Sequence, residues 1–357
     1  MAVPDLNNPL APSFRVTIDG TDLPFEAEAH TVAVTVDDTV ELPSMFTLEL
    51  VGSADQAADT SWVDDESLFA TGKVVEIKLG YGDDVESLIV GEITGLEPEF
   101  IFDRRPSLIV RGYDRRHRLQ RGRQTRTFIQ QKDSEIAEKI AREAGLTPQV
   151  IDSAVVHDYV IQANQTDLLF LQERAGRIQF EVVVEDKKMI FRPVSNDKSE
   201  VLTLTMDDHL LEFYPQLSSL QQVSEVSVRG WSPKEKKEMV GKAKTGDEVS
   251  TMGGKQSGPK LSQGAFGTAV GMVSAQPVMT QAEADQIAKA RLNELALLLV
   301  SGEGTCLGRT DLRAGKVIKI DGVGKRFSGQ YYVTAATHRY DPQDGYRTHF
   351  TVRRNAS

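Results

Sequence analysis

The chain has 357 residues, of which 40% are hydrophobic and 26% charged, and its formal net charge is −11 at pH 7. The composition is ordinary for a soluble globular protein, and the length allows about two or three domains. The longest aliphatic run, 295–300, is far shorter than the ~20 residues of a membrane helix, so no membrane anchor is expected. The first 16 residues lack the features of a secretory signal. The single cysteine, Cys306, excludes an intrachain disulfide and favours a reducing cytoplasm.

Charge is distributed unevenly along the chain. Residues 1–100 contain 21 acidic and 3 basic side chains, a net charge of −18, whereas residues 101–126 contain nine arginines and two aspartates, a net charge of +7. An acidic first third repels DNA and other polyanions. The arginine-rich run at 104–126 has the chemistry to bind phosphate, but its position beside the acidic third favours pairing with acidic protein surfaces.

The first 120 residues are expected to form short β-strands. Apolar residues alternate with polar ones, and Gly and Asp stand between the runs, which is typical of a β-barrel or β-sandwich. We therefore assign residues 1–120 to a first β-barrel domain. The strands are predicted at 14–18, 32–36, 46–50 and 75–79, with a further pair within 87–100 and 106–116.

A small α+β domain is expected at residues 121–200. Its first helix, in the stretch 133–144, can be capped by Asp133 or Ser134, and Gly145 follows its last turn. A second helix and two strands complete the domain, at about 166–175, 179–186 and 188–193.

Residues 201–357 are assigned to a second β-barrel domain. Alternating strand patterns return within 201–208 and 222–233. A stretch rich in Gly, Ser and Lys at about 244–278 is predicted to be a long loop or a partly disordered segment. A helix follows at about 280–300, because Thr280 and Glu283 form a T-x-x-E capping box.

The chain closes with a predicted β-hairpin, whose turn at 341–345 contains a Pro and a Gly. Residues from Tyr346 to Val352 alternate strictly, which predicts a half-buried strand. His349 then belongs to the polar face, and His338 lies on a partly buried one. We interpret both histidines as structural, because no nucleophile or acid with a recognisable motif accompanies them.

No motif for catalysis, cofactor binding or metal binding is recognised. The six histidines are scattered, and the single cysteine has no partner with which to hold a metal. The stretch GGKQSGPK lacks the order of a P-loop, and no G-x-S-x-G nucleophile elbow occurs. Cys306 has no cysteine-protease signature around it and is interpreted as a passive small apolar residue. We predict a protein that is not an enzyme and has no catalytic residues and no cofactor.

Several stretches resemble the phage late control D and tail-hub proteins, which share their fold with the N-terminal part of valine-glycine repeat (VgrG) spike proteins. The stretches occur in the family's order and span about 107–352. They are LIVRGYDRRHRLQRGRQTRTF, SEIAEKIAREAGL, TDLLFLQERAGRIQFEVVVEDKKMIFRP, VSVRGWSPKEKKEMVGKA and LRAGKVIKIDGVGKRFSGQYYVTAATHRYDPQDGYRTHFTV.

The resemblance implies a mainly β (α+β) fold, in which two related tube-like β-barrels are separated by a small inserted α+β domain. It also implies a homotrimeric baseplate hub, in which six barrels line a channel between the six-fold inner tube and the three-fold spike. Joining the β-sheets of neighbouring subunits would cover the edge strands, whose backbone groups are otherwise free to pair with other chains. The chain reaches Ser357 without the barrel and needle that continue VgrG proteins, so the spike is expected to be a separate polypeptide.

The partners implied by the resemblance are two further copies of the chain, the spike protein, the inner tube protein and other baseplate proteins. A tape-measure protein or a cargo would pass through the channel. The protein would be made in the bacterial cytoplasm and assembled into the baseplate of a phage tail or of an extracellular or cytoplasmic contractile injection particle.

Two other functions stay open. A nucleic-acid-binding barrel protein would use the arginine-rich run 104–126, although aromatic residues for base stacking are scarce nearby. A cell-wall hydrolase would need an acid/base pair that no motif supplies. From the charge distribution we expect the acidic first barrel to face the channel. We also expect Arg115, Arg116 and Arg118 to contact an acidic surface on a neighbouring subunit.

Overall fold

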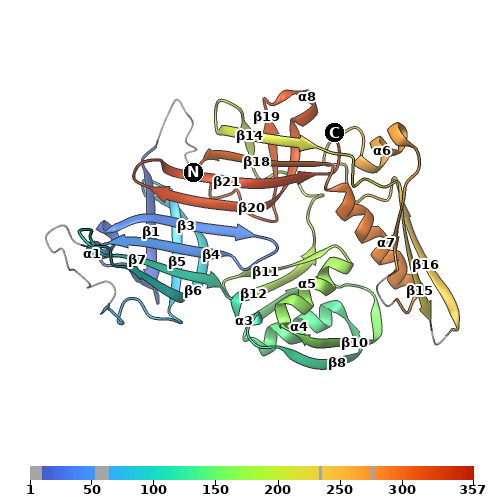
Figure 1. Ribbon diagram of the computed structural model, residues 1–357, viewed down its shortest axis with the longest axis horizontal. Coiled ribbons are helices and arrows are strands. Elements are labelled where there is room, and N and C mark those ends of the chain that lie inside the picture. Colours follow the sequence, from blue (N-terminus) through green and yellow to red (C-terminus); the bar gives the residue numbers. More distant parts are fainter. Residues whose placement is uncertain (1–9, 53–63, 233–234, 275–277) are drawn as a thin grey trace.

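The computed structural model describes residues 10–52, 64–232, 235–274 and 278–357. The expectation that the chain begins without a secretory signal falls largely on residues 1–9, which lie outside this part. In the described part the chain is mainly β, as predicted. Figure 1 shows blue strands from the first part of the chain beside red strands from its last part.

The N-terminal strands form because their apolar residues alternate with polar ones. In β4 the side chains of Phe46, Leu48 and Leu50 are buried and those between them are partly exposed. Gly112 lies opposite Phe46, whose ring occupies the space that a Cβ at Gly112 would need. The elements of this part are β1 (Pro12–Ile18), β2 (Thr21–Asp22), α1 (Phe25–Ala29), β3 (Thr31–Thr39), β4 (Met45–Val51), β5 (Val74–Tyr81), β6 (Asp84–Glu99) and β7 (Ser107–Asp114).

The C-terminal strands continue the same sheet. Its order is β14-β18-β21-β20-β3-β4-β7-β6-β5-β1-β2, so the N-terminal and C-terminal groups of strands meet where β3 pairs with β20. In that antiparallel pair Val34 to Thr39 lie opposite Tyr340 to Ala335. The C-terminal elements are β13 (Thr203–Thr205), β14 (Leu210–Leu217), β18 (Val300–Leu307), β19 (Val317–Asp321), α8 (Gly324–Phe327), β20 (Gly329–Asp341) and β21 (Gly345–Arg354).

Each half of the large sheet encloses its own apolar core, one from β1–β7 and one from β13, β14 and β18–β21. The tip of the β20–β21 hairpin crosses between them, because Tyr346 is buried in the first core. Its ring centroid lies 5.8 Å from that of Tyr81, and the rings of Phe14 and Tyr340 are 5.0 Å apart. The last hairpin therefore completes the first core as well as the second.

The inserted α+β region packs two helices against small sheets around a separate apolar core. The N-cap of α5 is Thr166, whose hydroxyl accepts from Leu169 N at 3.2 Å. The predicted cap of α4 is wrong: the N-cap is Lys132, and Asp133 is the first helical residue. The elements are α3 (Arg116–Leu119), β8 (Gln124–Lys132), α4 (Asp133–Glu143), β9 (Thr147–Val150), β10 (Val156–Gln165), α5 (Asp167–Arg177), β11 (Phe180–Glu185) and β12 (Lys188–Pro193).

The stretch 244–278 differs from the predicted long loop, because it contains a helix and a strand. Helix α6 starts after Ser257 with Pro259 in its first turn, and β17 pairs in parallel with β15. The next helix begins as predicted, since the Thr280 hydroxyl accepts from Glu283 N at 3.2 Å. The elements are β15 (Glu225–Ser232), β16 (Lys237–Lys244), α6 (Gly258–Phe266), β17 (Val270–Val273) and α7 (Gln281–Ala296).

The terminal hairpin confirms the alternation read from the sequence. Tyr346, Thr348, Phe350 and Val352 are buried, whereas His349 is exposed. Gly345 closes the turn with φ = 71°, a conformation that glycine adopts without steric cost. His338 is fully buried, more deeply than the sequence indicated. The division into three domains at about 120 and 200 stays a prediction, because the outer two share one sheet.

Helix α7 packs closely on β16, and this contact generates a stability prediction. A Cβ on Gly241 would stand 2.2 Å from the backbone of Ala284. We expect Gly241→Ala to push the helix away and lower the free energy of unfolding by about 1–3 kcal/mol. The matched control is Gly264→Ala in α6, where a Cβ meets nothing within 4 Å. Urea unfolding should leave this control unchanged or slightly more stable; an equal loss in both variants would contradict the close packing.

Candidate functional site

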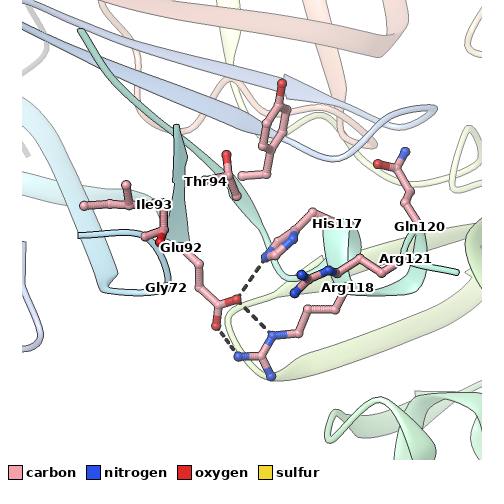
Figure 2. A pocket seen from close by; sticks show the side chains of 10 residues that line it. Gly72, Glu92, Ile93, Thr94, His117, Arg118, Gln120 and Arg121 are labelled. Atoms are coloured by element: carbon pink, nitrogen blue, oxygen red, sulfur yellow. Dashed lines mark hydrogen bonds and ion pairs between the residues drawn. The ribbon is translucent and has the colours of Figure 1, made fainter. Parts of the chain in front are cut away.

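The arginine-rich run extends from the loop before β7 into β8, and its central part, at the end of β7 and in α3, meets the long strand β6. Arg115 Nε donates to Glu92 Oε1 at 3.2 Å, and Arg118 Nε donates to Glu92 Oε2 at 2.9 Å. His117 Nε2 lies 2.9 Å from the same Oε2. Figure 2 shows the Glu92 side chain pointing at His117 and Arg118 from the neighbouring strand. One buried carboxylate thus holds three side chains of the run.

Glu92, His117 and Arg118 line a cavity of about 990 Å³. Burial alone would raise the pKa of Glu92, but the hydrogen bonds from Arg118 and His117 and the charges of Arg118 and Arg115 hold it below its ordinary value. Glu92 is therefore ionised at neutral pH and is not a proton donor of the kind that a hydrolase needs. The remaining lining comes from the residues around it: Thr71, Gly72, Ile93, Thr94, Tyr113, Gln120 and Arg121.

A second, largely buried network joins the two halves of the sheet. Arg116 Nε donates to Asp114 Oδ2 at 2.8 Å, and its Nη2 donates to Ser44 Oγ at 2.8 Å. Ser44 Oγ in turn donates to Asp38 Oδ1 at 3.0 Å. Asp38 also accepts from Arg313 Nε at 2.8 Å, a residue of the loop before β19. The network therefore runs from β7 through the β3–β4 turn to the C-terminal half.

The structure places the three arginines predicted for a subunit contact inside the chain's own ion pairs. Arg115 and Arg116 are 4% and 1% exposed, and Arg115 also pairs with Asp186 of the inserted region. They are committed to holding the subunit together, which corrects the idea that they form a surface for a neighbour. Of the three, Arg118 exposes its side chain (43%), and for it a subunit contact stays a prediction.

The sequence analysis missed Glu92 and Asp38 as partners of these arginines. A signal for Glu92 was present, because it is the single acid within the apolar run LIVGEITGL of a strand. A lone charge at a buried strand position requires an opposite charge nearby. Nothing in the sequence indicated that the partners of Glu92 would be Arg115, His117 and Arg118, because their proximity depends on the register between β6 and β7.

The other sequence candidates belong to the core. Cys306 is buried, and burial raises the pKa of its thiol well above its ordinary value. His338 Nδ1 lies 2.9 Å from the Tyr346 hydroxyl. Burial, aided by the charge of Arg313, lowers the pKa of His338 to about 3, although Asp38 and the Leu312 backbone act in the opposite direction. Both side chains are therefore neutral at pH 7 and serve packing.

A mostly polar row, with Met45 as its apolar member, crosses the sheet on the face opposite its cores. Thr337 Oγ1 donates to Asp37 Oδ1 at 2.7 Å at the β3–β20 junction, and Thr305 Oγ1 lies 2.8 Å from His349 Nδ1. Neighbours in this row stand directly opposite each other on successive strands, so it spans both halves of the chain. Its members are Glu212, Thr305, His349, Thr337, Asp37, Met45, Tyr113 and Glu92.

The described residues contain neither a metal-binding cluster nor a membrane-spanning helix. Within the residues that the structure places, no group of three or more His, Cys, Asp or Glu side chains is arranged to hold a metal ion. Among the helices of the same residues, none combines the length and apolar character of a membrane span.

Comparison with known proteins assigns the fold. Residues 9–341 match the family described as the Alg8 N-terminal domain. The chain belongs to this family. A search of curated proteins finds no match, so the further comparisons are with solved structures.

Members of this fold include phage tail proteins that align along nearly their whole length. A 43 kDa tail protein of prophage MuSo2 from Shewanella oneidensis superposes with a TM-score of 0.72 at 12% identity, over 96% of this chain and 98% of that chain. A tail protein from Neisseria meningitidis MC58 gives a TM-score of 0.68 at 12% identity, over 96% of both chains. At such identities the likeness establishes the fold alone.

A third solved structure connects the fold to secretion. The E. coli c3393 protein, described as a component of the type VI secretion system with structural similarity to the T4 tail proteins gp27 and gp5, gives a TM-score of 0.59 at 15% identity. The alignment covers 96% of this chain and 77% of that chain. The tail-hub-like fold expected from the sequence is therefore confirmed, whereas membership in the late control D family itself stays a prediction.

The buried network predicts an order of stability among arginine variants. Replacing Arg116 with Ala leaves the buried Asp114 carboxylate without its counter-charge, which we expect to cost about 3–5 kcal/mol of unfolding free energy. Arg118→Ala removes a half-exposed side chain and leaves the Glu92 carboxylate with Arg115 and His117 as partners, so we expect a clearly smaller loss. Chemical denaturation of the two variants checks this order, and equal losses would refute the structural role of Arg116.

Burial of His338 predicts a pH dependence of stability. Its pKa is about 3 in the folded state against 6.5 for the ordinary side chain, so below pH 6.5 the unfolded chain binds a proton that the folded chain does not. Stability should therefore fall on acidification from pH 6.5, by up to about 1.4 kcal/mol per pH unit from this residue. The decrease in unfolding free energy per pH unit should be smaller in His338→Gln and should stay unchanged in the control His349→Gln at the surface. Denaturant midpoints measured for both variants and the wild type from pH 7 to pH 4 give the comparison.

Proposed function

We propose that the chain is a structural baseplate hub of a contractile tail or a phage-derived injection system. The observation that carries the proposal is the pairing of β3 with β20, which joins two enclosed β-cores into one sheet within one subunit. A ring of three such subunits would present six β-units around an axis. That number fits a six-fold inner tube, while the three-fold symmetry of the subunits fits a spike.

The polar row fits a channel lining in such a ring. It is continuous across both halves of the chain and contains acidic, basic and hydroxyl side chains, among them Glu212, Asp37 and His349. A wall of interleaved charges and hydroxyls presents no broad apolar area to which a passing polypeptide would adhere. The tape-measure protein or a cargo would travel along it, and the inner tube, the spike and other baseplate proteins would contact the ends of the ring.

The same geometry argues against the two other functions. Five arginines of the run 104–126 pair with carboxylates of the chain itself, which reduces their value as phosphate ligands: Arg111, Arg115, Arg116, Arg118 and Arg126. Glu92, a buried carboxylate beside them, is held ionised by its arginine and histidine neighbours. We therefore infer that the protein acts as a structural component without enzymatic activity.

Measuring the mass and the shape of the purified protein tests this function. Light scattering after size exclusion should give a mass of about three chains of 39.4 kDa. Electron microscopy should show a ring of six similar lobes around an axial opening, which binds the end of a tube when the inner tube protein of the same system is added. A stable monomer that does not associate even with the tube would refute the hub function.

A further inference from the structure

The loop between β6 and β7 exposes three large apolar side chains at its tip. Phe102 is 99% exposed, and Phe100 and Ile101 beside it are also exposed. The loop has a defined backbone conformation, because Arg104 N donates to Ile101 O at 3.1 Å and Asp103 has φ = 61°. This is a tight turn that holds Phe102 outward in a fixed place. A rigid aromatic tip of this kind is typical of an anchor that enters a pocket on a partner.

The charges beside the tip indicate the kind of pocket. Arg104 and Arg105 follow it, both are exposed, and within the described residues neither forms an ion pair. The anchor would therefore suit an apolar cavity with acidic side chains at its rim. An anionic membrane surface is a poorer partner, because residues 1–100, which lead directly into the loop, carry a net charge of −18.

The chain itself has a cavity with these properties. A hollow of about 470 Å³ lies between the β3–β4 turn, helix α5, strand β11 and the residues that follow helix α7. Glu41 and Glu294 are among its lining residues, with side chains 72% and 56% exposed. Each lies near an arginine of its own subunit, Glu41 at 3.9 Å from Arg353, which also lines the cavity, and Glu294 at 2.6 Å from Arg291, so a neighbour's arginines would share or replace these exposed pairs. Gly176 of α5 leaves the hollow open, since a Cβ there would meet nothing within 4 Å. The apolar lining comprises Val40, Leu42, Ala175, Phe180, Val182, Val194, Leu297 and Tyr332.

Loop and cavity cannot meet within one subunit. The loop ends at Ser107, the first residue of β7. Ser107 lies opposite Val51, the last residue of β4, so the loop is at the C-terminal end of β4. The cavity lies beside Leu42, beyond the first residue of β4, Met45. Seven residues of strand separate these two ends, which is roughly 20 Å. The two surfaces are therefore free to engage only between copies of the chain.

We propose that loop 100–106 of one subunit inserts Phe102 into the cavity beside Gly176 of the next subunit, with Arg104 and Arg105 facing Glu41 and Glu294. The contact joins two different surfaces of the same chain, so it is heterologous and closes into a ring when repeated around an axis. The inference rests on the proposed trimer and identifies the residues that hold it together.

The test measures the subunit dissociation constant of the purified protein by analytical ultracentrifugation or mass photometry. Phe102→Ser should raise it at least about tenfold, as expected for an aromatic anchor at the centre of an interface. Gly176→Phe, which fills the cavity from the other side, should do the same. The control is Leu220→Ser, an equally exposed apolar residue outside the loop (90%), which should change nothing.

A charge exchange distinguishes this contact from a general loss of association. Arg104→Glu with Arg105→Glu should weaken the trimer, and so should Glu41→Arg with Glu294→Arg, whereas combining all four should restore association. A wild-type trimer that is unaffected by Phe102→Ser and Gly176→Phe overturns the inference and leaves the hub function intact. Binding of the wild-type loop to anionic vesicles with no effect on association would assign the tip to a membrane and also overturn it. A wild-type protein that forms no trimer would refute the proposed function itself.

Discussion

The pairing of β3 with β20 is the constraint on which the rest of the structure depends. The two strands come from opposite ends of the chain, and Thr337 and Asp37, which are hydrogen-bonded side chain to side chain, are 300 residues apart in the sequence. Their ladder fixes the register of the strands on either side, because each further strand is paired to one already placed. This register aligns polar side chains in one row across the strands and core side chains in the adjacent row.

The buried charges at the junction serve the same arrangement. Asp38 stands near the end of β3, and Arg313 comes from the loop before β19, so their ion pair spans the two halves of the sheet. Burial works against ionisation of Asp38, but the charges of Arg313 and Arg116 and the hydrogen bonds from Arg313 and Ser44 prevail, and its pKa lies below the ordinary value. Such buried pairs add little net stability compared with apolar packing, but they are costly to break and therefore favour one arrangement of the halves over others.

Local structure could be predicted from the sequence where one physical rule dominates. The terminal hairpin follows from alternation and from Gly345, and the starts of α5 and α7 follow from capping threonines. The prediction failed at 244–278, where low apolar content concealed a short helix that the rest of the chain supports. It also misplaced Arg115 and Arg116 on the surface. Composition identifies a basic segment, but only strand register reveals that Glu92 and Asp114 neutralise it from within.

The insertion of Tyr346 into the first core has a consequence for biosynthesis. The N-terminal β-unit lacks both its β20 neighbour and this aromatic side chain until nearly the whole polypeptide has left the ribosome. Contacts between such distant segments form slowly, and an incomplete sheet exposes a strand edge in the meantime. The nascent chain must therefore carry an unfinished, aggregation-sensitive unit through most of translation, while the inserted region, whose contacts are local, is able to fold first.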